Sequence, residues 1–297
     1  TCALPISFSQ FPHFRNTASR VLDIFNDGNG TLWVAAHYMG VAKIDYNGNI
    51  FWLNTPDTVA FSSVSKGLNG EILFGTNWGV YTLDNGNLKS YLLPDTFVRK
   101  IFNFNDGHIY YAAHGGFYIQ SGNSVKSFSL PKNYNASNVF AVFKDPVHGI
   151  LIGTKGGLYT VSGDSLVRFN HNGFNITDEV YAINKDFSGN FWFGTSKNLI
   201  SWNGNSTSKV YNSKIGLIPG EINRSALLID SKQKIWIGTE LGVSAYNPHF
   251  DYFNNPIPKP VFNGIFSNGF KLIPDSGNYN FASGDNKIGR ASCRERV

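Results

Sequence analysis

The stretch at residues 235–243, IWIGTELGV, consists of a hydrophobic triplet, a small residue, a threonine and a turn that contains glycine. Near-copies stand upstream: LFGTNWGVY from residue 73, LIGTKGGLY from residue 151 and FWFGTSKNLI from residue 191. A short apolar run that ends in a glycine turn is typical of a β-strand that folds back into a second strand. The chain therefore repeats one strand–turn–strand unit.

The small residue that follows each hydrophobic triplet serves as the anchor of the repeat. It occurs six times, as Ala35, Gly75, Ala112, Gly153, Gly194 and Gly238, at intervals of 40, 37, 41, 41 and 44 residues. A period of this regularity indicates an array of similar supersecondary units. We expect the anchor to be Gly or Ala because neighbouring units crowd there and a larger side chain would not fit.

Each unit reads as four short strands joined by tight turns. An alternating run comes first, an Asp-containing turn leads to the triplet, and two more strands follow after turns rich in Gly and Asn. Four strands of about five residues with their turns fill about 40 residues, which is one blade of a β-propeller. A solenoid needs shorter units, a sandwich does not repeat its sequence, and the period-2 alternation excludes helical repeats. We predict an all-β chain with a propeller of four-stranded blades at residues 8–250.

The consensus of the unit resembles the two-component regulator propeller repeat: an alternating strand, an Asp turn, then a hydrophobic residue, Trp, a second hydrophobic residue, Gly and Thr. The resemblance spans residues 18–247; it is strong at Trp33, Trp192 and Trp236 and weaker where Leu73 and Tyr110 replace the tryptophan. It implies the periplasmic sensor region of a hybrid two-component system, whose rings usually have seven blades.

Six blades are visible in the sequence. The segment SFSQFPHF at residues 7–14 has two interpretations. It is either the outermost strand of an earlier blade that is missing, which we favour, or the strand that closes the ring on the last blade.

A second resemblance concerns residues 246–272, which are similar to the junction where that family leaves its last blade and enters a β-sandwich named for its tyrosines. Pro258, Pro260, Asn268 and Gly269 carry the similarity. We predict the truncated start of such a sandwich at residues 251–288, with non-native flanks at residues 1–7 and 289–297. The resemblance implies a homodimer formed through the sandwich, and contact with a membrane only through parts outside this chain.

The sequence offers no catalytic, metal-binding or cofactor-binding pattern. An Asp recurs eight residues before four anchors, as Asp27, Asp145, Asp186 and Asp230. One copy in each blade places these carboxylates far apart, and Asp commonly stabilises turns, so we expect a structural role. The seven histidines lack the spacing of metal ligands, and NDGNG at residues 26–30 lacks the acidic ligands of a calcium loop. We expect no metal, no cofactor and no enzymatic activity in this chain.

The net charge of the chain bears on whether it binds nucleic acid. The chain carries +5, and its tail contributes Arg290, Arg294 and Arg296 against Glu295. The remainder is close to neutral and holds no basic cluster, so nucleic acid is not an expected partner.

The turns that follow the anchors vary from blade to blade and supply the candidate binding residues. In an antiparallel four-stranded blade, the turn between the second and third strands lies on the same rim as the connection between blades. This rim would carry His37, Tyr38, Asn77, Trp78, His114, Lys155, Lys197 and Glu240 around the central channel. Aromatic rings stack on apolar sugar faces and polar groups bind hydroxyls, so we predict a glycan or small-molecule ligand there. Solvated turn residues are the alternative.

These observations favour an extracytoplasmic ligand-sensing propeller, in the periplasm or at the cell surface, that recognises a glycan or oligosaccharide for a two-component signalling protein. A protein-interaction scaffold at the cell surface or in a secretion system fits the lack of a catalytic pattern equally well. A polysaccharide-active enzyme would need acidic, His or Tyr side chains that converge on the channel, and the sequence shows no such set.

Overall fold

The structure is a computed structural model that describes residues 20–130, 138–248, 261–267, 270–272 and 287–292. The chain divides into two compact units, Thr1–Tyr246 and Asn247–Val297, which are described separately here. The predicted domain boundary at residue 250 lies close to this division and stays a prediction. In the ranges given above, no helix has the length and the apolar character that crossing a membrane requires.

The first unit is all-β and begins with three antiparallel four-stranded sheets, blades 1 to 3. Blade 1 comprises β1 (Val21–Asn26), β2 (Leu32–Ala36), β3 (Gly40–Ile44) and β4 (Ile50–Trp52). Blade 2 comprises β5 (Phe61–Lys66), β6 (Ile72–Thr76), β7 (Gly79–Asp84) and β8 (Asn87–Leu92). Blade 3 comprises β9 (Val98–Asn103), β10 (His108–Ala113), β11 (Gly116–Ser121) and β12 (Ser124–Ser129).

Three further sheets complete the unit. Blade 4 comprises β13 (Val139–Asp145), β14 (Gly149–Thr154), β15 (Gly157–Ser162) and β16 (Ser165–Arg168). Blade 5 comprises β17 (Val180–Lys185), β18 (Phe191–Thr195), β19 (Leu199–Trp202) and β20 (Ser208–Tyr211), followed by a short 3₁₀ helix, Ser213–Ile215. Blade 6 has three strands, β21 (Ile222–Ile229), β22 (Ile235–Thr239) and β23 (Gly242–Tyr246).

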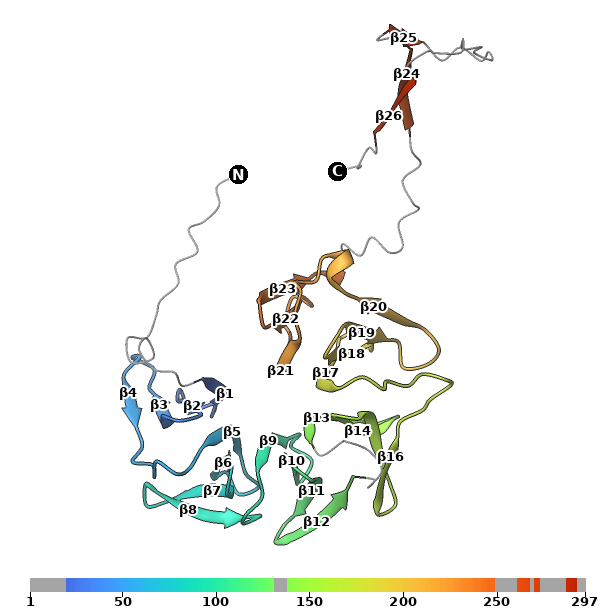
Figure 1. The fold of residues 1–297 in the computed structure, drawn as a ribbon. Coiled ribbons are helices and arrows are strands. Elements are labelled where there is room, and N and C mark those ends of the chain that lie inside the picture. Colours follow the sequence, from blue (N-terminus) through green and yellow to red (C-terminus); the bar gives the residue numbers. More distant parts are fainter. Residues whose placement is uncertain (1–19, 131–137, 249–260, 268–269, 273–286, 293–297) are drawn as a thin grey trace. The chain divides into compact units, whose positions relative to one another are not determined.

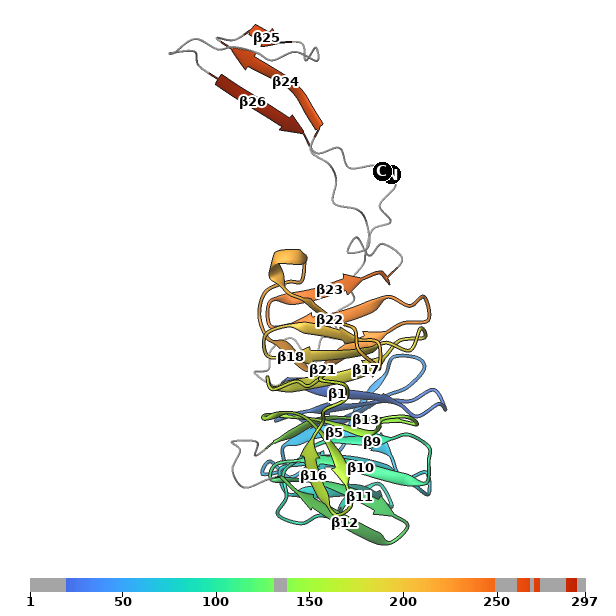
Figure 2. The ribbon, with the colours of Figure 1, turned by 90° about the vertical axis from the view of Figure 1, so that its right-hand side faces the viewer.

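The six sheets form a propeller ring, which confirms the predicted fold class. The first strand of each blade lies nearest the middle of the ring (Figure 1), and from the side the sheets lie on one another as layers (Figure 2). Neighbouring blades pack through their first strands, from β1 on β5 to β17 on β21. Within the described residues the ring is open between blade 6 and blade 1 (Figure 1). Residues 7–14, which could bear on this opening, lie outside those residues.

The core consists of apolar layers between neighbouring blades, because one four-stranded sheet cannot bury both of its faces alone. Five clusters of buried side chains join blades 1 and 2, 2 and 3, 3 and 4, 4 and 5, and 5 and 6. The layer between blades 4 and 5, for example, contains Leu151, Leu158, Phe191 and Trp202. The triplets of the repeat therefore fill the space between blades.

The anchors occupy the narrowest part of these layers. A Cβ added at Gly153 would lie 2.7 Å from the backbone oxygen of Val180, in the first strand of the next blade. At Gly194 the added atom would lie 2.8 Å from Cγ2 of Ile222. At these anchors the crowding confirms the predicted reason for a small residue, whereas at Gly238 the nearest atom is the Cβ of Ala226 in the same blade.

The second unit contains a three-stranded antiparallel sheet in the order β25–β24–β26. Its strands are β24 (Val261–Ser267), β25 (Phe270–Leu272) and β26 (Lys287–Ser292). β26 pairs with β24 and runs across residue 288, where the predicted sandwich segment ends and the predicted flank begins. Both assignments stay predictions.

Candidate functional site

One backbone hydrogen bond recurs in all six blades and fixes the rim on which the predicted residues lie. The residue two positions after each anchor donates its backbone N–H to a carbonyl oxygen at the entry into the first strand. The six pairs, at 2.9–3.1 Å, are His37–Arg20, Asn77–Ala60, His114–Phe97, Lys155–Asn138, Ser196–Glu179 and Glu240–Glu221. The turns after the anchors and the starts of the first strands therefore share one rim of the propeller.

The predicted residues occupy two positions of this turn. His37, Asn77, His114, Lys155 and Glu240 are the hydrogen-bonded residues themselves, and Tyr38, Trp78 and Lys197 follow by one position. Blade 5 places Ser196 at the hydrogen-bonded position, which the prediction left out. The structure thus locates all eight residues on one rim, and their role in binding stays a prediction.

Blades 1 and 2 carry exposed aromatic side chains on the rim. Tyr38 is 76% exposed and its ring meets that of His37 edge-on, with centroids 4.1 Å apart. Trp78 is 49% exposed, and its Nε1–H donates to the carbonyl oxygen of Thr58 at 3.1 Å. The same carbonyl oxygen accepts from Asn77 Nδ2 at 3.2 Å. The indole of Trp78 is therefore held at one edge while much of its surface faces solvent.

Blades 4 to 6 carry charged groups around a shallow depression of about 430 Å³. Its lining comprises Lys155, Thr177, Asp178, Glu179, Ser196, Lys197 and Glu221. Lys197 Nζ lies 2.6 Å from Asp178 Oδ1, an exposed pair that contributes little to stability. The structure brings Lys155 and Lys197 together at this depression, whereas Glu240 does not line it.

A β-bulge at the start of each first strand redirects one side chain, and sequence reasoning missed this feature. The pairing of the first strand with the second shifts by one residue in blades 1 to 5, which leaves Leu22, Ser62, Arg99, Phe140 and Tyr181 out of register. In blade 6 the irregular stretch is longer and lies between Ile222 and Leu227. Bulges re-aim side chains and are frequent beside functional sites.

The bulged residues of blades 3 to 6 meet, and we name Arg99, Phe140, Tyr181 and Arg224 the axial cluster. The Phe140 and Tyr181 rings stand edge-on with centroids 5.0 Å apart. The Arg224 guanidinium lies 4.7 Å from the Phe140 centroid and 5.9 Å from that of Tyr181. Since Arg224 belongs to blade 6 and Phe140 to blade 4, this contact passes over blade 5 and must lie near the axis of the ring.

Arg99 is held by both an amide and aromatic rings. Its Nε–H donates to Asn138 Oδ1 at 2.9 Å, and His114 Nδ1 lies 2.9 Å from the same oxygen. Its guanidinium carbon lies 4.5 Å from the ring centroid of Phe97 and 5.8 Å from that of Phe140. His114, a predicted site residue, therefore joins the surroundings of the axial cluster.

Burial and neighbouring charges shift the pKa values of two residues in the axial cluster, Arg99 and Tyr181. Burial, and after it the charge of Arg224, lowers the pKa of Arg99 to about 10. Burial, and after it the hydrogen bond that the Tyr181 hydroxyl donates to Glu179, raises the pKa of that tyrosine above its ordinary value. Glu221 Oε1 lies 3.5 Å from the same hydroxyl. Two carboxylates and a tyrosine thus converge at the axis, a set that the sequence did not reveal.

The recurring Asp residues lie in the turns between first and second strands and stabilise them, as predicted. Asp186 accepts backbone N–H groups of Ser188 and Asn190 and the Trp192 Nε1–H at 2.8 Å. Asp27 and Asp230 bind their own turns and the tryptophan of the triplet in the same way. Among the residues that the structure describes, no group of three or more His, Cys, Asp or Glu side chains could hold a metal ion.

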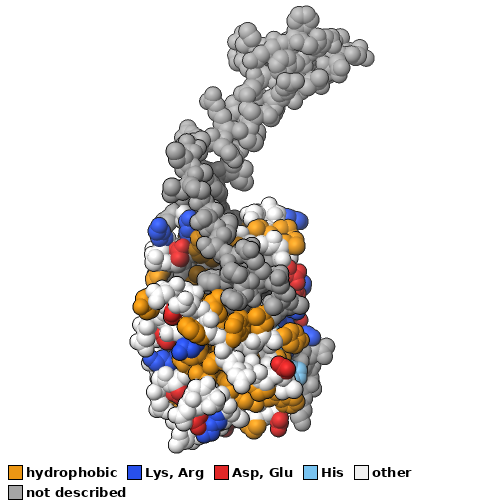
Figure 3. Space-filling view, turned by 90° about the vertical axis from the view of Figure 1, so that its left-hand side faces the viewer, with side chains coloured by type: hydrophobic (Ala, Val, Ile, Leu, Met, Phe, Trp, Pro, Cys, Tyr) orange, Lys and Arg blue, Asp and Glu red, His pale blue; other side chains and the backbone are white. Residues whose placement is uncertain are grey.

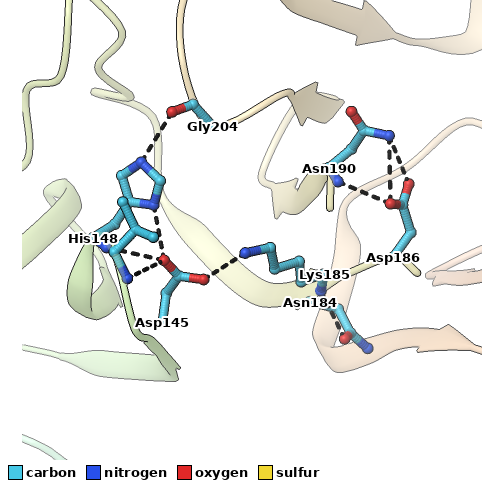
Figure 4. Close-up of polar contacts among 8 residues, drawn as sticks. Asp145, His148, Asn184, Lys185, Asp186, Asn190 and Gly204 are labelled. Carbon is cyan, nitrogen blue, oxygen red and sulfur yellow. Dashed lines mark hydrogen bonds and ion pairs between the residues drawn. The ribbon is translucent and has the colours of Figure 1, made fainter. Parts of the chain in front are cut away.

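Blade 4 lacks the tryptophan, and its Asp145 makes a buried clamp to blade 5 instead (Figure 4). Asp145 accepts from Lys185 Nζ at 2.6 Å and from two backbone N–H groups, and its carboxylate lies 2.9 Å from His148 Nδ1. His148 Nε2 lies 2.9 Å from the Gly204 carbonyl oxygen in blade 5. Burial opposes ionisation of Asp145, but these hydrogen bonds outweigh it and lower its pKa to about 2. The clamp holds neighbouring blades together.

The fold is similar to several solved propellers, whereas no family model and no curated protein matches the sequence. The extracellular domain of a protein described as a hybrid two-component system from B. thetaiotaomicron superposes with TM-score 0.63 at 21% identity; 80% of this chain covers 34% of that one. A second such domain from B. thetaiotaomicron gives TM-score 0.56 at 19% identity, with 86% of this chain and 44% of that chain covered. The chain thus spans less than half of either protein.

A lyase has a similar propeller. A catalytically inactive variant of virginiamycin B lyase from Staphylococcus aureus, bound to quinupristin, gives TM-score 0.62 at 16% identity, with 78% of this chain and 81% of that chain covered. At identities this low, the similarities show the propeller fold, and the fold by itself hosts unrelated functions.

Proposed function

We propose that this propeller is the extracytoplasmic ligand-sensing module of a two-component signalling protein and that it binds an oligosaccharide on the rim described above. The observation that carries the proposal is that this rim has an aromatic part and a polar part. Exposed aromatic side chains lie on blades 1 and 2, and charged and amide groups surround the axial cluster on blades 3 to 6.

The aromatic part of the rim suits the apolar faces of sugar rings. An exposed indole whose edge is fixed by a hydrogen bond loses little conformational freedom when a ligand stacks on it, which favours affinity. Trp78 meets this condition through Thr58. The polar part supplies side-chain amide, carboxylate and ammonium groups that could bind hydroxyls, among them Asn138, Glu221 and Lys155.

The similarity to extracellular domains of hybrid two-component systems supports a sensory role and a location outside the cytoplasm. The resemblance of the repeats to two-component regulator propellers points the same way. In this proposal the predicted β-sandwich segment at residues 251–288 carries the effect of ligand binding to a second copy of the chain.

Binding without catalysis is the simplest use of the axial cluster. Tyr181 could act as a general base only by losing its proton, and burial together with the bond to Glu179 raises its pKa and opposes that loss. Because a lyase has a similar fold, the absence of catalysis should be tested directly. Incubation of the chain with polysaccharides, followed by a reducing-end assay, would detect cleavage. Formation of product would contradict a purely sensory role.

The proposal is tested by calorimetry of the full chain with a panel of neutral and acidic oligosaccharides. We expect Tyr38→Ala and Trp78→Ala to weaken binding about 3- to 10-fold each, the worth of one aromatic contact. Tyr46→Ala and Phe187→Ala are matched controls, because these side chains are also exposed but lie in turns at the opposite ends of the strands. Failure of every oligosaccharide to bind to the folded chain would contradict the proposal and favour the scaffold alternative.

A further inference from the structure

The two arginines of the axial cluster differ from the paired lysines of the same unit. In the described part of the chain, lysine side chains form ion pairs with aspartates at six places, including Lys100–Asp23, Lys144–Asp106 and Lys185–Asp145. Within the described part of the chain, neither Arg99 nor Arg224 forms an ion pair, and Arg224 makes no hydrogen bond. Two positive charges therefore lie near the axis, and among the described residues neither forms an ion pair with Glu179 or Glu221, the two carboxylates beside the Tyr181 hydroxyl.

Aromatic rings hold these charges in place without neutralising them. Arg99 lies against Phe97 and Phe140, and Arg224 lies over Phe140 and Tyr181. Stacking orients a guanidinium group but leaves its in-plane N–H donors available. For Arg99, Nε is used by Asn138, and its terminal nitrogens have no partner among the described residues. Donors of both arginines are thus free to bind a ligand.

Electrostatics are unfavourable at Arg99. Its guanidinium is partly buried without an ion pair, and the positive charge of the exposed Arg224 nearby adds repulsion. Both effects are visible at Arg99, whose pKa falls to about 10 through burial and the charge of Arg224. An anion between the two groups would relieve the repulsion and satisfy the free donors at once.

We infer that Arg99 and Arg224 form a subsite for an anionic group, the carboxylate of a uronic acid or the sulfate of a sulfated sugar. This inference rests on the proposed function, since it assigns the class of oligosaccharide. Guanidinium groups bind planar carboxylates and sulfate oxygens through paired N–H donors, with stronger hydrogen bonds than neutral partners make. Glu179 and Glu221 lie against the Tyr181 hydroxyl, and their negative charges would exclude an anion from that part of the cluster.

The test is calorimetry of the full chain with trigalacturonate, a sulfated chondroitin disaccharide and the neutral maltotriose. We expect the acidic probes to bind at least about tenfold more tightly than maltotriose, and to lose affinity as salt is raised. The tighter of the two acidic probes identifies the group. Arg99→Gln and Arg224→Gln should each weaken acidic binding about 10- to 100-fold, as expected for loss of a charge-assisted hydrogen bond.

Arg168→Gln is the matched control. Arg168 also lies over an aromatic ring, 5.5 Å from the Tyr159 centroid, but it ends the outermost strand of blade 4. Its substitution should leave binding unchanged. Arg224 is exposed, so Arg224→Gln should fold normally and keeps the test decisive even if Arg99→Gln unfolds. Arg99→Lys retains the charge without the paired donors and should recover part of the affinity.

Two kinds of failure can be told apart. Equal binding of maltotriose, or unchanged acidic binding in both glutamine variants, overturns the anionic subsite while oligosaccharide recognition stands. A second outcome is that no sugar binds, but inorganic sulfate raises the melting temperature and this effect requires both arginines. That outcome supports the anionic subsite and overturns the proposed function. Absence of binding by every acidic probe and by sulfate overturns the subsite.

Discussion

Replacement of Gly153 by alanine tests the central packing feature of the propeller. The added Cβ would lie 2.7 Å from the Val180 carbonyl oxygen, 2.9 Å from Val180 Cγ1 and 3.2 Å from the Ala141 Cβ. Ordinary contacts begin at 3.4 Å, so the first of these distances is 0.7 Å too short. Because the nearest atom belongs to the backbone of β17, relief requires β14 of blade 4 and β17 of blade 5 to separate.

The expected cost follows from two opposing terms. Overpacking of a filled core costs about 1–3 kcal/mol. Replacing Gly by Ala within a strand recovers about 0.5–1 kcal/mol of conformational free energy. The midpoints of these ranges give a net destabilisation of about 1.2 kcal/mol for Gly153→Ala, which lowers the melting temperature of a unit of this size by about 2–5 °C. Thermal unfolding of the full chain, followed by circular dichroism, measures this shift.

Gly75→Ala is the internal comparison for this experiment. Its added Cβ would lie 3.1 Å from the Val98 carbonyl oxygen, so a smaller movement suffices and a smaller loss is expected. Ala35 and Ala112 show that some anchors accept a methyl group. If Gly153→Ala melts at or above the temperature of the unaltered chain, blade crowding does not explain the anchor.

Two further predictions concern the layers between blades. Hydrogen bonds outweigh the opposing effect of burial and set the Asp145 pKa at about 2, below its unfolded value. The resulting stability is present at neutral pH and is lost as pH falls from about 4 through 2. Asp145→Asn should lower the free energy of unfolding by about 2 kcal/mol at pH 7 and weaken its dependence on acid pH, as measured by urea unfolding. If the free energy of unfolding depends on pH as in the unaltered chain, the clamp to Lys185 is contradicted. Val243→Ala should change the unfolding free energy by less than about 0.5 kcal/mol, whereas Val80→Ala, at the equivalent buried position, should cost about 2 kcal/mol; equal losses would refute the difference in burial.

The fold was predictable because its determinants are local and repeated. The anchors, the apolar triplets and the turn-forming Asp residues recur at nearly constant spacing, and each acts within one blade or on its immediate neighbour. Asp186 shows this well, since Ser188, Asn190 and Trp192, which donate to its carboxylate, all lie within six residues. The rim was predictable for the same reason, because strand alternation decides which turns share an end of the sheet.

The axial cluster could not be predicted in this way. Arg99, Phe140, Tyr181 and Arg224 are unlike one another, so no repeated pattern marks them. They converge because each of these first strands is irregular near its start, with a one-residue shift of register in blades 3 to 5 and a longer irregular stretch in blade 6. Neither irregularity leaves a signature in the sequence. The available signal was position, because each is the second or third residue of a first strand. Aligned on the anchors, Arg99, Phe140 and Tyr181 share one column, 13 residues before the anchor, whereas Arg224 lies 14 residues before its anchor and falls outside that column.

The end blades reveal how much each blade depends on its neighbours. Val243 in blade 6 is 63% exposed, while its equivalents in blades 1 and 2, Val41 and Val80, are fully buried. On blade 1, Ile24 is 60% exposed, although Val64 at the same position in blade 2 is buried. The view onto the side of the ring that includes blade 1 shows hydrophobic side chains at the surface (Figure 3). Equivalent positions thus differ in burial because, within the described residues, blade 1 and blade 6 each have a neighbouring blade on one side alone.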